Sequence, residues 1–343
     1  MPFSAIYARL TAFRRSLFEQ GVYSSHSLGA PTISVGNITV GGTGKTPMVA
    51  YVAAFLAEEG EKVCVISRGY KRENPKDRVL VSDGETVLAD PKSAGDEPTE
   101  LAERLIGKAA VIADRDRVAA AAWARARFSP TVFVLDDAFQ HFRARRDLDI
   151  VLVDATNPFG NRKTLPFGIL REPLEELRRA DLIVITRSNL VDQSRIAEIK
   201  TEIRDYAECP VICSRNQFDR FISIAGEPVE RPSGRSLYAF CAIGNPSNFF
   251  DQLRSEGFAT VGTRTFGDHH FYSKDDADAI QRGARAAGAD LLITTGKDAV
   301  KLKGVNLKVE CVVAVNGLEF DQAEVLNALL KQAVGPDSDQ SPS

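Results

Sequence analysis

The sequence predicts an α/β fold with a doubly wound, mostly parallel sheet in a three-layer α/β/α arrangement and a second, smaller α/β domain. Short β-branched runs alternate with helical patterns along most of the chain. A Gly-rich loop separates the first run from the first long helical pattern. At 343 residues, the chain also exceeds the usual size of one compact domain.

Residues 1–208 form the first predicted domain. Its expected strands are rich in β-branched residues, as buried parallel strands usually are. They lie at residues 32–35, 63–66, 110–113, 132–135, 150–153 and 182–186. Helical patterns occupy most of the intervals, so right-handed crossover connections between parallel strands follow.

The alternation breaks over residues 209–235, where strand-like pieces at 211–214 and 221–224 are separated by Pro and Gly. We interpret this stretch as a strand-like linker or domain boundary. The second domain, residues 236–334, has expected strands at 236–242, 259–265, 291–295 and 310–315, and expected helices at 246–256, 275–287 and 320–333. Residues 335–343 are rich in Ser, Pro and Asp, and we expect a disordered tail.

The charge balance disfavours a nucleic-acid partner, because 43 Lys and Arg face 46 Asp and Glu and leave a net charge of −3. Five cysteines with a single close pair, Cys209 and Cys213, do not complete a zinc site, so we expect reduced thiols. The sequence has no apolar run of about 18 residues and no signal-peptide pattern. We therefore expect the protein on the cytoplasmic side.

Residues 3–20 place apolar side chains at helical spacing, with Arg9, Arg14 and Arg15 off that stripe and Gly21 at its end. Two interpretations are open. The helix either packs on its own domain, which the spacing alone favours, or lies in a membrane interface.

The most informative segment is the loop TVGGTGKT at residues 39–46, between a predicted strand and a predicted helix. Backbone N–H groups of such a P-loop cradle phosphate, a lysine neutralises it, and a hydroxyl helps to bind Mg²⁺. The predicted phosphate-binding residues are Thr39, Val40, Gly41, Gly42, Thr43, Gly44, Lys45 and Thr46. The loop is a variant, because Thr39 replaces the first Gly of the pattern. A Gly-rich turn that binds nothing is the simpler alternative.

Asp136 and Asp137 follow the apolar run at residues 132–135. An acid at such a strand end holds the Mg²⁺ of P-loop proteins, although paired carboxylates also occur in ordinary turns. With the phosphate loop in the same domain, the pair predicts a nucleotide–Mg²⁺ site.

Eight ordered motifs carry a resemblance to a known family. They are VGN at 35–37, SRGY at 67–70, GDEP at 95–98, DDAFQH at 136–141, LREP at 170–173, IGNP at 243–246, DHH at 268–270 and KDAVK at 297–301. In this order they resemble the tetraacyldisaccharide 4'-kinase, or lipid A 4'-kinase, family over residues 3–332. Ala138, residues 167–169 and Gly296 depart from that family's pattern. These departures affect loop geometry rather than phosphate ligands.

The resemblance implies transfer of the γ-phosphate of ATP to the 4'-hydroxyl of tetraacyldisaccharide 1-phosphate, a lipid A precursor. It implies a peripheral protein on the cytoplasmic face of the inner membrane, which favours the interfacial interpretation of residues 3–20. No nucleic-acid partner and no obligate protein partner are expected.

The resemblance also assigns residues. Asp96 is the expected catalytic base, with His269, rather than His270, orienting it or taking its proton, and Lys45 completes the catalytic set. Thr46, Asp136, Asp137 and Glu172 are the expected metal-site residues. The expected substrate-binding residues are Arg68, Glu97, Arg117, His141, Arg171 and His270.

From the residues alone, simpler interpretations stand beside these roles. Asp96 is also placed to cap a helix that has Pro98 in its first turn. The two adjacent histidines also suit a surface, a core or a metal site, and the arginines and Glu172 also suit solvated ion pairs.

Two other functions share the phosphate loop. A membrane-associated switch ATPase of the partitioning type would need a lysine where Val40 stands. A P-loop ligase that activates a soluble carboxylate would leave the basic N-terminal helix unexplained.

Overall fold

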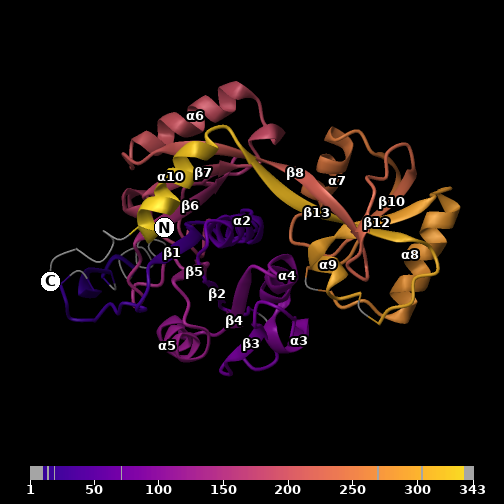
Figure 1. Cartoon of the computed structure of the whole chain (residues 1–343). Coiled ribbons are helices and arrows are strands. Elements are labelled where there is room, and N and C mark those ends of the chain that lie inside the picture. Colours follow the sequence, from indigo (N-terminus) through magenta and orange to yellow (C-terminus); the bar gives the residue numbers. More distant parts are fainter. Residues whose placement is uncertain are drawn as a thin grey trace. The chain divides into compact units, whose positions relative to one another are not determined.

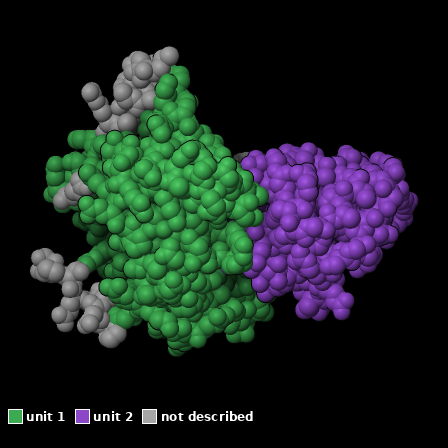
Figure 2. Space-filling model, turned by 90° about the horizontal axis from the view of Figure 1, so that it is seen from above, with its two compact units in different colours: residues 1–89, 93–215, 319–343 green, residues 90–92, 216–318 purple. Residues whose placement is uncertain are grey.

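The computed structural model describes residues 11–13, 15–18, 20–70, 72–268, 270–302 and 304–335. The chain divides into two compact units, coloured separately in Figure 2. The first unit holds the described residues of Met1–Ala89, Ser93–Arg215 and Glu319–Ser343. The second unit holds those of Asp90–Lys92 and Asn216–Leu318.

The first unit is built on a sheet in the order β8-β7-β6-β1-β5-β2-β4-β3. All its strand pairs are parallel except β3 with β4. The strands are β1 (Thr32–Asn37), β2 (Val63–Ser67), β3 (Val79–Ser82), β4 (Ala109–Ala113), β5 (Val132–Asp136), β6 (Leu148–Asp154), β7 (Leu182–Thr186) and β8 (Val211–Ser223). The predicted mostly parallel α/β fold is confirmed.

Helices cover both faces of this sheet. They are α2 (Lys45–Glu58), α3 (Pro91–Ala94), α4 (Asp96–Arg104), α5 (Arg117–Phe128), α6 (Gln193–Arg204) and α10 (Ala323–Val334), with 3-10 turns η1 (Leu174–Arg179) and η2 (Ser188–Leu190). Helix α2 connects β1 to β2 and α5 connects β4 to β5, and in each case one strand lies between the two in the sheet. Helix α6 connects the neighbouring strands β7 and β8, and Figure 1 shows it lying over β7.

Strand register tells which helices share a face. Leu135 of β5 and Val151 of β6 both align with the same side of β1, through Ser34 and Gly36. Leu135 packs in a cluster with α5, and Val151 packs in a cluster with α6. The alternate residues, such as Ile33 and Val134, are fully buried on the opposite face, where α2 contacts β1, β2 and β5.

The second unit has its own sheet and core. Its strand order is β11-β10-β12-β13-β8, with β9 paired antiparallel to β8. The elements are β9 (Pro228–Val229), β10 (Ser236–Cys241), β11 (Ala259–Thr265), β12 (Leu291–Thr295), β13 (Cys311–Phe320), α7 (Pro246–Ser255), α8 (Lys274–Ala286) and α9 (Gly296–Ala299). Four aromatic rings, Phe218, Phe221, Phe249 and Phe258, form much of one cluster of this core.

Two expected boundaries differ from the structure. In the stretch 209–235, interpreted as a strand-like linker or domain boundary, the two expected strand pieces form one long strand, β8, followed by β9, and the chain passes from the first unit to the second between Arg215 and Asn216. Asn216 and Arg215 interrupt the apolar pattern because they lie in the middle of β8, where its residues are half-buried or exposed rather than core.

The end of the chain also departs from the expected second domain of residues 236–334. Strand β13 is longer than expected, and α10 packs on α2 and β6 of the first unit. The Tyr51 hydroxyl donates to Asn327 Oδ1 at 3.2 Å, and the Tyr51 and Phe320 rings lie 4.8 Å apart. Helical spacing shows that an apolar face exists, but not which sheet covers it.

The expected disordered tail, residues 335–343, lies outside the described residues from 336 onward. Of the helix expected over 3–20, residues 11–13 and 15–18 are described and are helical, whereas Arg9 and Arg14 lie outside the described part. Within the described ranges, no helix combines the length and apolar character needed to cross a membrane.

We predict that Gly36→Ala lowers the stability of the first unit. A Cβ at Gly36 would lie 2.7 Å from Phe139 Cβ and 2.9 Å from Phe139 N, closer than real contacts allow. Overpacking of this kind costs about 1–3 kcal/mol. Urea unfolding followed by fluorescence of Trp123, the single tryptophan, reports on this unit.

Gly42→Ala is the matched control, because a Cβ there meets no heavy atom within 4 Å. Equal unfolding midpoints for the two variants would contradict the packing argument.

Candidate active site

The phosphate loop joins β1 to α2 and contains two glycines in the left-handed region. Gly41 has φ 117°, and Gly44, the residue that precedes α2, has φ 86°. Side chains are strained at such angles, so the backbone path itself requires glycine at both positions. Because α2 begins directly after Gly44, its first N–H groups form the kind of helix terminus that binds anions.

Contacts to the carbonyls and a hydroxyl of this loop fix its path. Arg187 Nη2 donates to the Gly42 carbonyl at 2.6 Å, and Thr186 Oγ1 donates to the Thr43 carbonyl at 3.0 Å. Asn37 Nδ2 donates to Thr43 Oγ1 at 3.0 Å. Because these contacts use the carbonyls of the loop and the Thr43 hydroxyl, the backbone N–H groups of the loop are left to bind a phosphate.

Sequence reasoning missed Arg187 and Thr186. Arg187 has φ 56°, is buried and is ion-paired with Asp154. Thr186 is the last residue of the buried strand β7 and Arg187 follows it. A polar pair at the end of such a strand is the pattern that points to them, because carboxyl ends of parallel strands meet at the ligand-binding edge of a sheet.

The variant position Thr39 lies in a short backbone pairing, and its contact with phosphate stays a prediction. Thr39 forms an isolated antiparallel bridge with Leu170, and Val40 N donates to the Ile169 carbonyl at 2.7 Å. Arg171 N donates in turn to the Ile38 carbonyl at 2.7 Å. The LREP motif is therefore attached directly to the start of the phosphate loop.

Asp137 is the centre of the charged cluster beside the loop. Arg171 Nη1 donates to both of its oxygens, at 2.8 and 2.9 Å, and Lys45 Nζ lies 3.6 Å from Oδ1. Asp137 has φ 51°, which turns the chain sharply at the end of β5. The structure thus brings together three of the predicted site residues.

Asp136 has a different environment. Its Oδ2 accepts a hydrogen bond from Ser67 Oγ at 2.7 Å, and its backbone carbonyl accepts one from Arg117 Nη2 at 3.0 Å. Arg117, predicted to bind substrate, is buried and donates to the backbone carbonyls of Asp114 and Arg115 as well. Its contact with substrate stays a prediction.

The two adjacent carboxyl groups shift in opposite directions. Burial and the negative charges of Glu97 and Asp137 raise the pKa of Asp136 to about 6. Burial also acts to raise the pKa of Asp137, but Lys45 and Arg171 outweigh it and lower that pKa. Asp137 is therefore a fixed negative charge, whereas Asp136 is an acid that a nearby cation would help to ionise.

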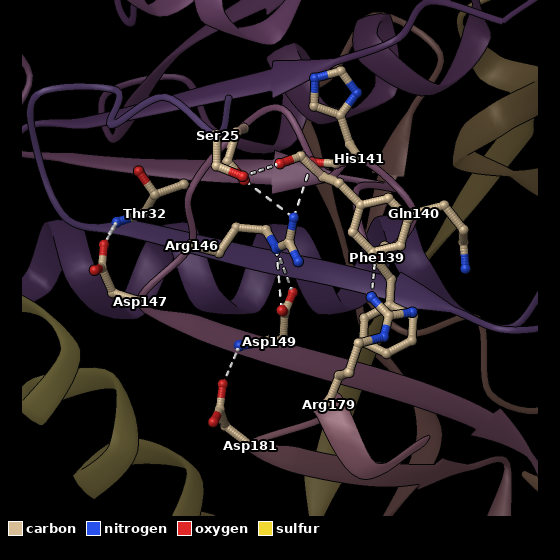
Figure 3. A network of polar contacts seen from close by, with 12 residues as sticks. Ser25, Thr32, Phe139, Gln140, His141, Arg146, Asp147, Asp149, Arg179 and Asp181 are labelled. Carbon is tan, nitrogen blue, oxygen red and sulfur yellow. Dashed lines mark hydrogen bonds and ion pairs between the residues drawn. The ribbon is translucent and has the colours of Figure 1, made fainter. Parts of the chain in front are cut away.

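Glu172 is buried between Arg179 and Gln140. Its Oε2 accepts from Arg179 Nη2 at 2.7 Å and from Gln140 Nε2 at 3.0 Å, and only 3% of its surface is exposed. Gln140 Nε2 also donates to the Asn37 carbonyl at 2.9 Å. Figure 3 shows Arg179 beside Phe139, whose carbonyl accepts from its Nη1 at 3.0 Å.

Asp96 begins α4, and its side chain is buried. Gly95, with φ 98°, is the N-cap residue, so Asp96 lies in the first turn and does not cap the helix as the simpler interpretation supposed. A Cβ on Gly95 would lie 3.1 Å from the Tyr70 carbonyl and 3.2 Å from Gly69 Cα. The SRGY and GDEP motifs therefore pack together, while the Arg68 side chain is exposed.

His141 is half-buried in a positive environment. Burial, followed by Arg117, Arg146 and Arg143, lowers its pKa to about 4, so the ring is neutral at pH 7. Its carbonyl accepts from Arg146 Nη1 at 2.9 Å, and Arg146 also pairs with Asp149 (Figure 3).

The DHH motif lies in the second unit. His270 Nε2 lies 2.9 Å from Asp276 Oδ2, and its ring stacks on Phe266 at 5.0 Å. A Cβ on Gly244 would lie 3.3 Å from Asp268 Oδ2, so the IGNP and DHH motifs adjoin. His269 lies outside the described residues. The Asp96–His269 pair stays a prediction.

The KDAVK motif contributes a buried acid to the same unit. Asp298 accepts from Ala242 N and Tyr272 Oη, each at 3.0 Å, and from Thr295 Oγ1 at 2.6 Å. Burial raises its pKa. Asp298 thus ties the ends of β10 and β12 to the loop that follows the DHH motif.

The metal site also stays a prediction. Among the described residues, no three His, Cys, Asp or Glu side chains are arranged to hold a metal ion by themselves. Asp136 and Asp137 remain oxygen donors beside the phosphate loop, whereas Glu172 is engaged by Arg179 and Gln140.

A glycine loop at a helix N-terminus, with a lysine and two strand-end carboxylates beside it, defines a P-loop protein of the phosphate-binding class. The chain matches the family described as Tetraacyldisaccharide-1-P 4'-kinase over residues 1–334. It belongs to the tetraacyldisaccharide 4'-kinase (LpxK) family. It is therefore a phosphotransferase acting on an alcohol group in lipid A biosynthesis, and the switch-ATPase and ligase alternatives are set aside.

Individual relatives agree with this assignment. The Tetraacyldisaccharide 4'-kinase of Geobacter metallireducens is 42% identical over 314 residues, which cover 91% of this chain and 90% of that protein. The Pelobacter propionicus protein of the same name is 40% identical over 332 residues, 96% of this chain and 90% of its own. A crystal structure described as the "apo" form of LpxK from Aquifex aeolicus in complex with ATP is 30% identical, with a TM-score of 0.79, and the match covers 97% of this chain and 98% of that one.

We predict that Asp136→Asn stabilises the first unit at pH 8. The folded pKa of about 6 lies above the ordinary value of 3.8, so ionisation opposes folding, and the stability present below about pH 4 is lost as pH rises through 6. Removal of the charge is expected to add up to about 3 kcal/mol at pH 8.

Urea unfolding at pH 8 and pH 4 tests this, with Asp205→Asn as the control because that side chain is exposed on the first unit. An equal gain in the free energy of unfolding at pH 4, or no gain at pH 8, would show that the charge of Asp136 does not destabilise the folded state.

Proposed function

We propose that the chain transfers the γ-phosphate of ATP to the 4'-hydroxyl of tetraacyldisaccharide 1-phosphate. The observation that carries this proposal is the phosphate loop with Lys45, Asp137 and Arg171 held beside it. The crystal structure of a family member in complex with ATP supports the choice of donor.

The phosphate loop would hold the β- and γ-phosphates. Phosphoryl transfer depends on alignment and charge neutralisation more than on covalent chemistry. Lys45 is kept beside the loop by Asp137, and its charge is therefore in place before nucleotide binds. Thr46 is buried at the start of α2, next to Lys45, as a phosphate-loop hydroxyl should be.

Mg²⁺ fits the donor set of this site. The oxygens of Asp136, Asp137 and Thr46 are the kind of ligand that Mg²⁺ prefers, and it usually takes its remaining ligands from phosphate and water. The raised pKa of Asp136 supports a cation there, because a positive charge would relieve the repulsion from Glu97 and Asp137. Bound Mg²⁺ supplies charge neutralisation on the phosphates.

Asp96 is proposed as the base. The 4'-oxygen attacks the γ-phosphorus, the bond from that phosphorus to the β–γ bridging oxygen breaks, and ADP leaves with the bridging oxygen. Asp96 takes the hydroxyl proton. Burial of Asp96 at the start of α4, behind the packed glycines 69 and 95, supports a fixed position for it. His269, rather than His270, would orient Asp96 or relay its proton.

The remaining predicted residues divide by what they contact. Arg171 holds Asp137, and Arg117 holds the Asp136 backbone, so both organise the phosphate site. Glu97 lies close enough to raise the pKa of Asp136. Arg68, which is exposed, and His141, which is neutral, are proposed to contact the sugar or its 1-phosphate.

The lipid substrate places the reaction at a membrane, and we propose the cytoplasmic face of the inner membrane. Phe13 is 61% exposed, Val22 64% and Tyr23 50%. Exposed apolar side chains on and just after the N-terminal helix support an interfacial role for this part of the chain.

We predict that Lys45→Ala and Asp96→Asn each reduce phosphate transfer by at least about 100-fold. The first removes the positive charge that neutralises the phosphates, and the second removes the proposed base. The assay follows label from γ-labelled ATP into tetraacyldisaccharide 1-phosphate in detergent micelles with Mg²⁺. Lys62→Ala, at an exposed lysine, is the control. ATP hydrolysis without labelled lipid in the wild type would overturn the proposed reaction, and unchanged transfer by Asp96→Asn would remove Asp96 as the base.

We also predict that Arg187→Gln raises the KM for ATP by about 10-fold with a smaller change in kcat. Loss of the contact to the Gly42 carbonyl loosens the loop before nucleotide binds. Arg195→Gln, an exposed position on α6, is the control. An unchanged KM would mean that the loop holds its path without Arg187.

A further inference from the structure

Arg15, on the described part of the N-terminal helix, points into the protein rather than toward solvent. Its side chain is 15% exposed and forms an ion pair with Glu176 of η1, whose side chain is 7% exposed. The sequence grouped Arg15 with the basic residues off the apolar stripe of a helix expected at a membrane interface. Its burial shows that it contacts the first unit instead.

Arg179 continues this contact toward the phosphate loop. Its Nε lies 2.9 Å from Glu176 Oε2, its Nη2 donates to Glu172 Oε2 at 2.7 Å, and its Nη1 donates to the Phe139 carbonyl at 3.0 Å. The planar guanidinium reaches all three at once, which an ammonium group cannot do.

Three successive ion pairs form what we call the alternating charge chain: Arg15 with Glu176, Glu176 with Arg179, and Arg179 with Glu172. Its far end reaches the phosphate loop through Gln140, which contacts both Glu172 and the Asn37 carbonyl. Asn37 in turn donates to Thr43 of the loop. Every member of the alternating charge chain lies in the first unit.

Aromatic contacts link the same two regions independently. The Phe18 ring, on the N-terminal helix, lies 5.7 Å from the Phe142 ring. The Arg179 guanidinium lies 4.9 Å from the Phe142 centroid and 3.9 Å from that of Phe139. The N-terminal helix is therefore linked, through aromatic rings and through charges, to the segment 139–142 that follows the strand-end acids.

We propose that the alternating charge chain makes Arg15 and Arg179 positioning residues for phosphoryl transfer, by coupling the N-terminal helix to Glu172, Gln140 and the phosphate loop. Removal of Arg15 leaves Arg179 as the remaining partner of Glu176 in the alternating charge chain. Arg179 is then drawn from Glu172, because a buried carboxylate requires compensation. The inference rests on the proposed role of this loop as the ATP site.

The coupling gives the helix a part in the turnover step as well as in attachment. A helix that serves only as an anchor would change how much enzyme reaches the lipid, and saturating substrate would hide its loss. A helix that positions Glu172 and Gln140 would change kcat even when all enzyme is bound.

Arg15→Gln tests this distinction, with Arg178→Gln as the matched control because Arg178 is exposed in η1 next to Arg179. We measure kcat at saturating ATP and lipid in mixed micelles, and sedimentation with phosphatidylcholine–phosphatidylglycerol vesicles. Arg15→Gln is expected to lower kcat by about 10-fold with the vesicle-bound fraction unchanged. Loss of vesicle binding with kcat retained at saturation would overturn the proposal and return Arg15 to a lipid contact.

A double-mutant cycle with Glu176→Gln separates coupling from misfolding. The pair Arg15→Gln/Glu176→Gln restores charge balance, so it is expected to recover at least part of the kcat lost in Arg15→Gln alone. Strictly additive losses would overturn the proposal, because Arg15→Gln would then cost as much in the Glu176→Gln background as in the wild type. Where Arg15→Gln alone is too unstable to assay, a pair about 10-fold less active than Glu176→Gln would overturn it as well. Failure of wild type and Arg178→Gln to label lipid would instead reject the proposed reaction.

Discussion

The carboxylate of Asp137 organises the site, because two cations from separate segments meet on it. Lys45 comes from the start of α2 and Arg171 from the LREP segment, which is also paired with the backbone just before the phosphate loop. Asp137 thereby fixes the lysine and the loop relative to the end of β5. Its lowered pKa keeps it charged throughout the neutral range, so this arrangement does not depend on bound nucleotide.

The neighbouring Asp136 shows the opposite condition, and the contrast explains how the site is prepared for a cationic partner. It is buried beside Glu97 and Asp137, with Ser67 as its hydroxyl donor. A buried carboxyl group with a raised pKa reduces folding stability at neutral pH and attracts positive charge. Placement of such a group beside a phosphate loop exchanges some stability for binding, as functional sites often do.

The parallel strands and the phosphate loop were predictable because their signals are local. A short run of β-branched residues predicts a buried strand. Glycines in the loop indicate positive φ angles, which Gly41 and Gly44 adopt. Strand β8 was expected as two short pieces, because it carries exposed polar residues in its middle. Helix α10 was expected at nearly the observed residues but in the second domain, whereas it packs on elements far back in the sequence. Arg15 and Arg179 gave no local sign of an inward role, because surface and buried arginines look alike in a sequence. Arg187 is marked only by its position directly after the buried strand β7.

The sequence by itself determined the α/β class, the phosphate loop, the strand-end acids and, through its ordered motifs, the kinase family. Each of these depends on residues that are adjacent in the chain or on patterns of short period. Only the tertiary structure decided that Asp137 joins Lys45 to Arg171, that Arg187 holds the loop by its carbonyl, and that Arg15 reaches Glu176. These contacts join residues far apart in the chain, and long side chains find such partners only after the sheet has set their positions.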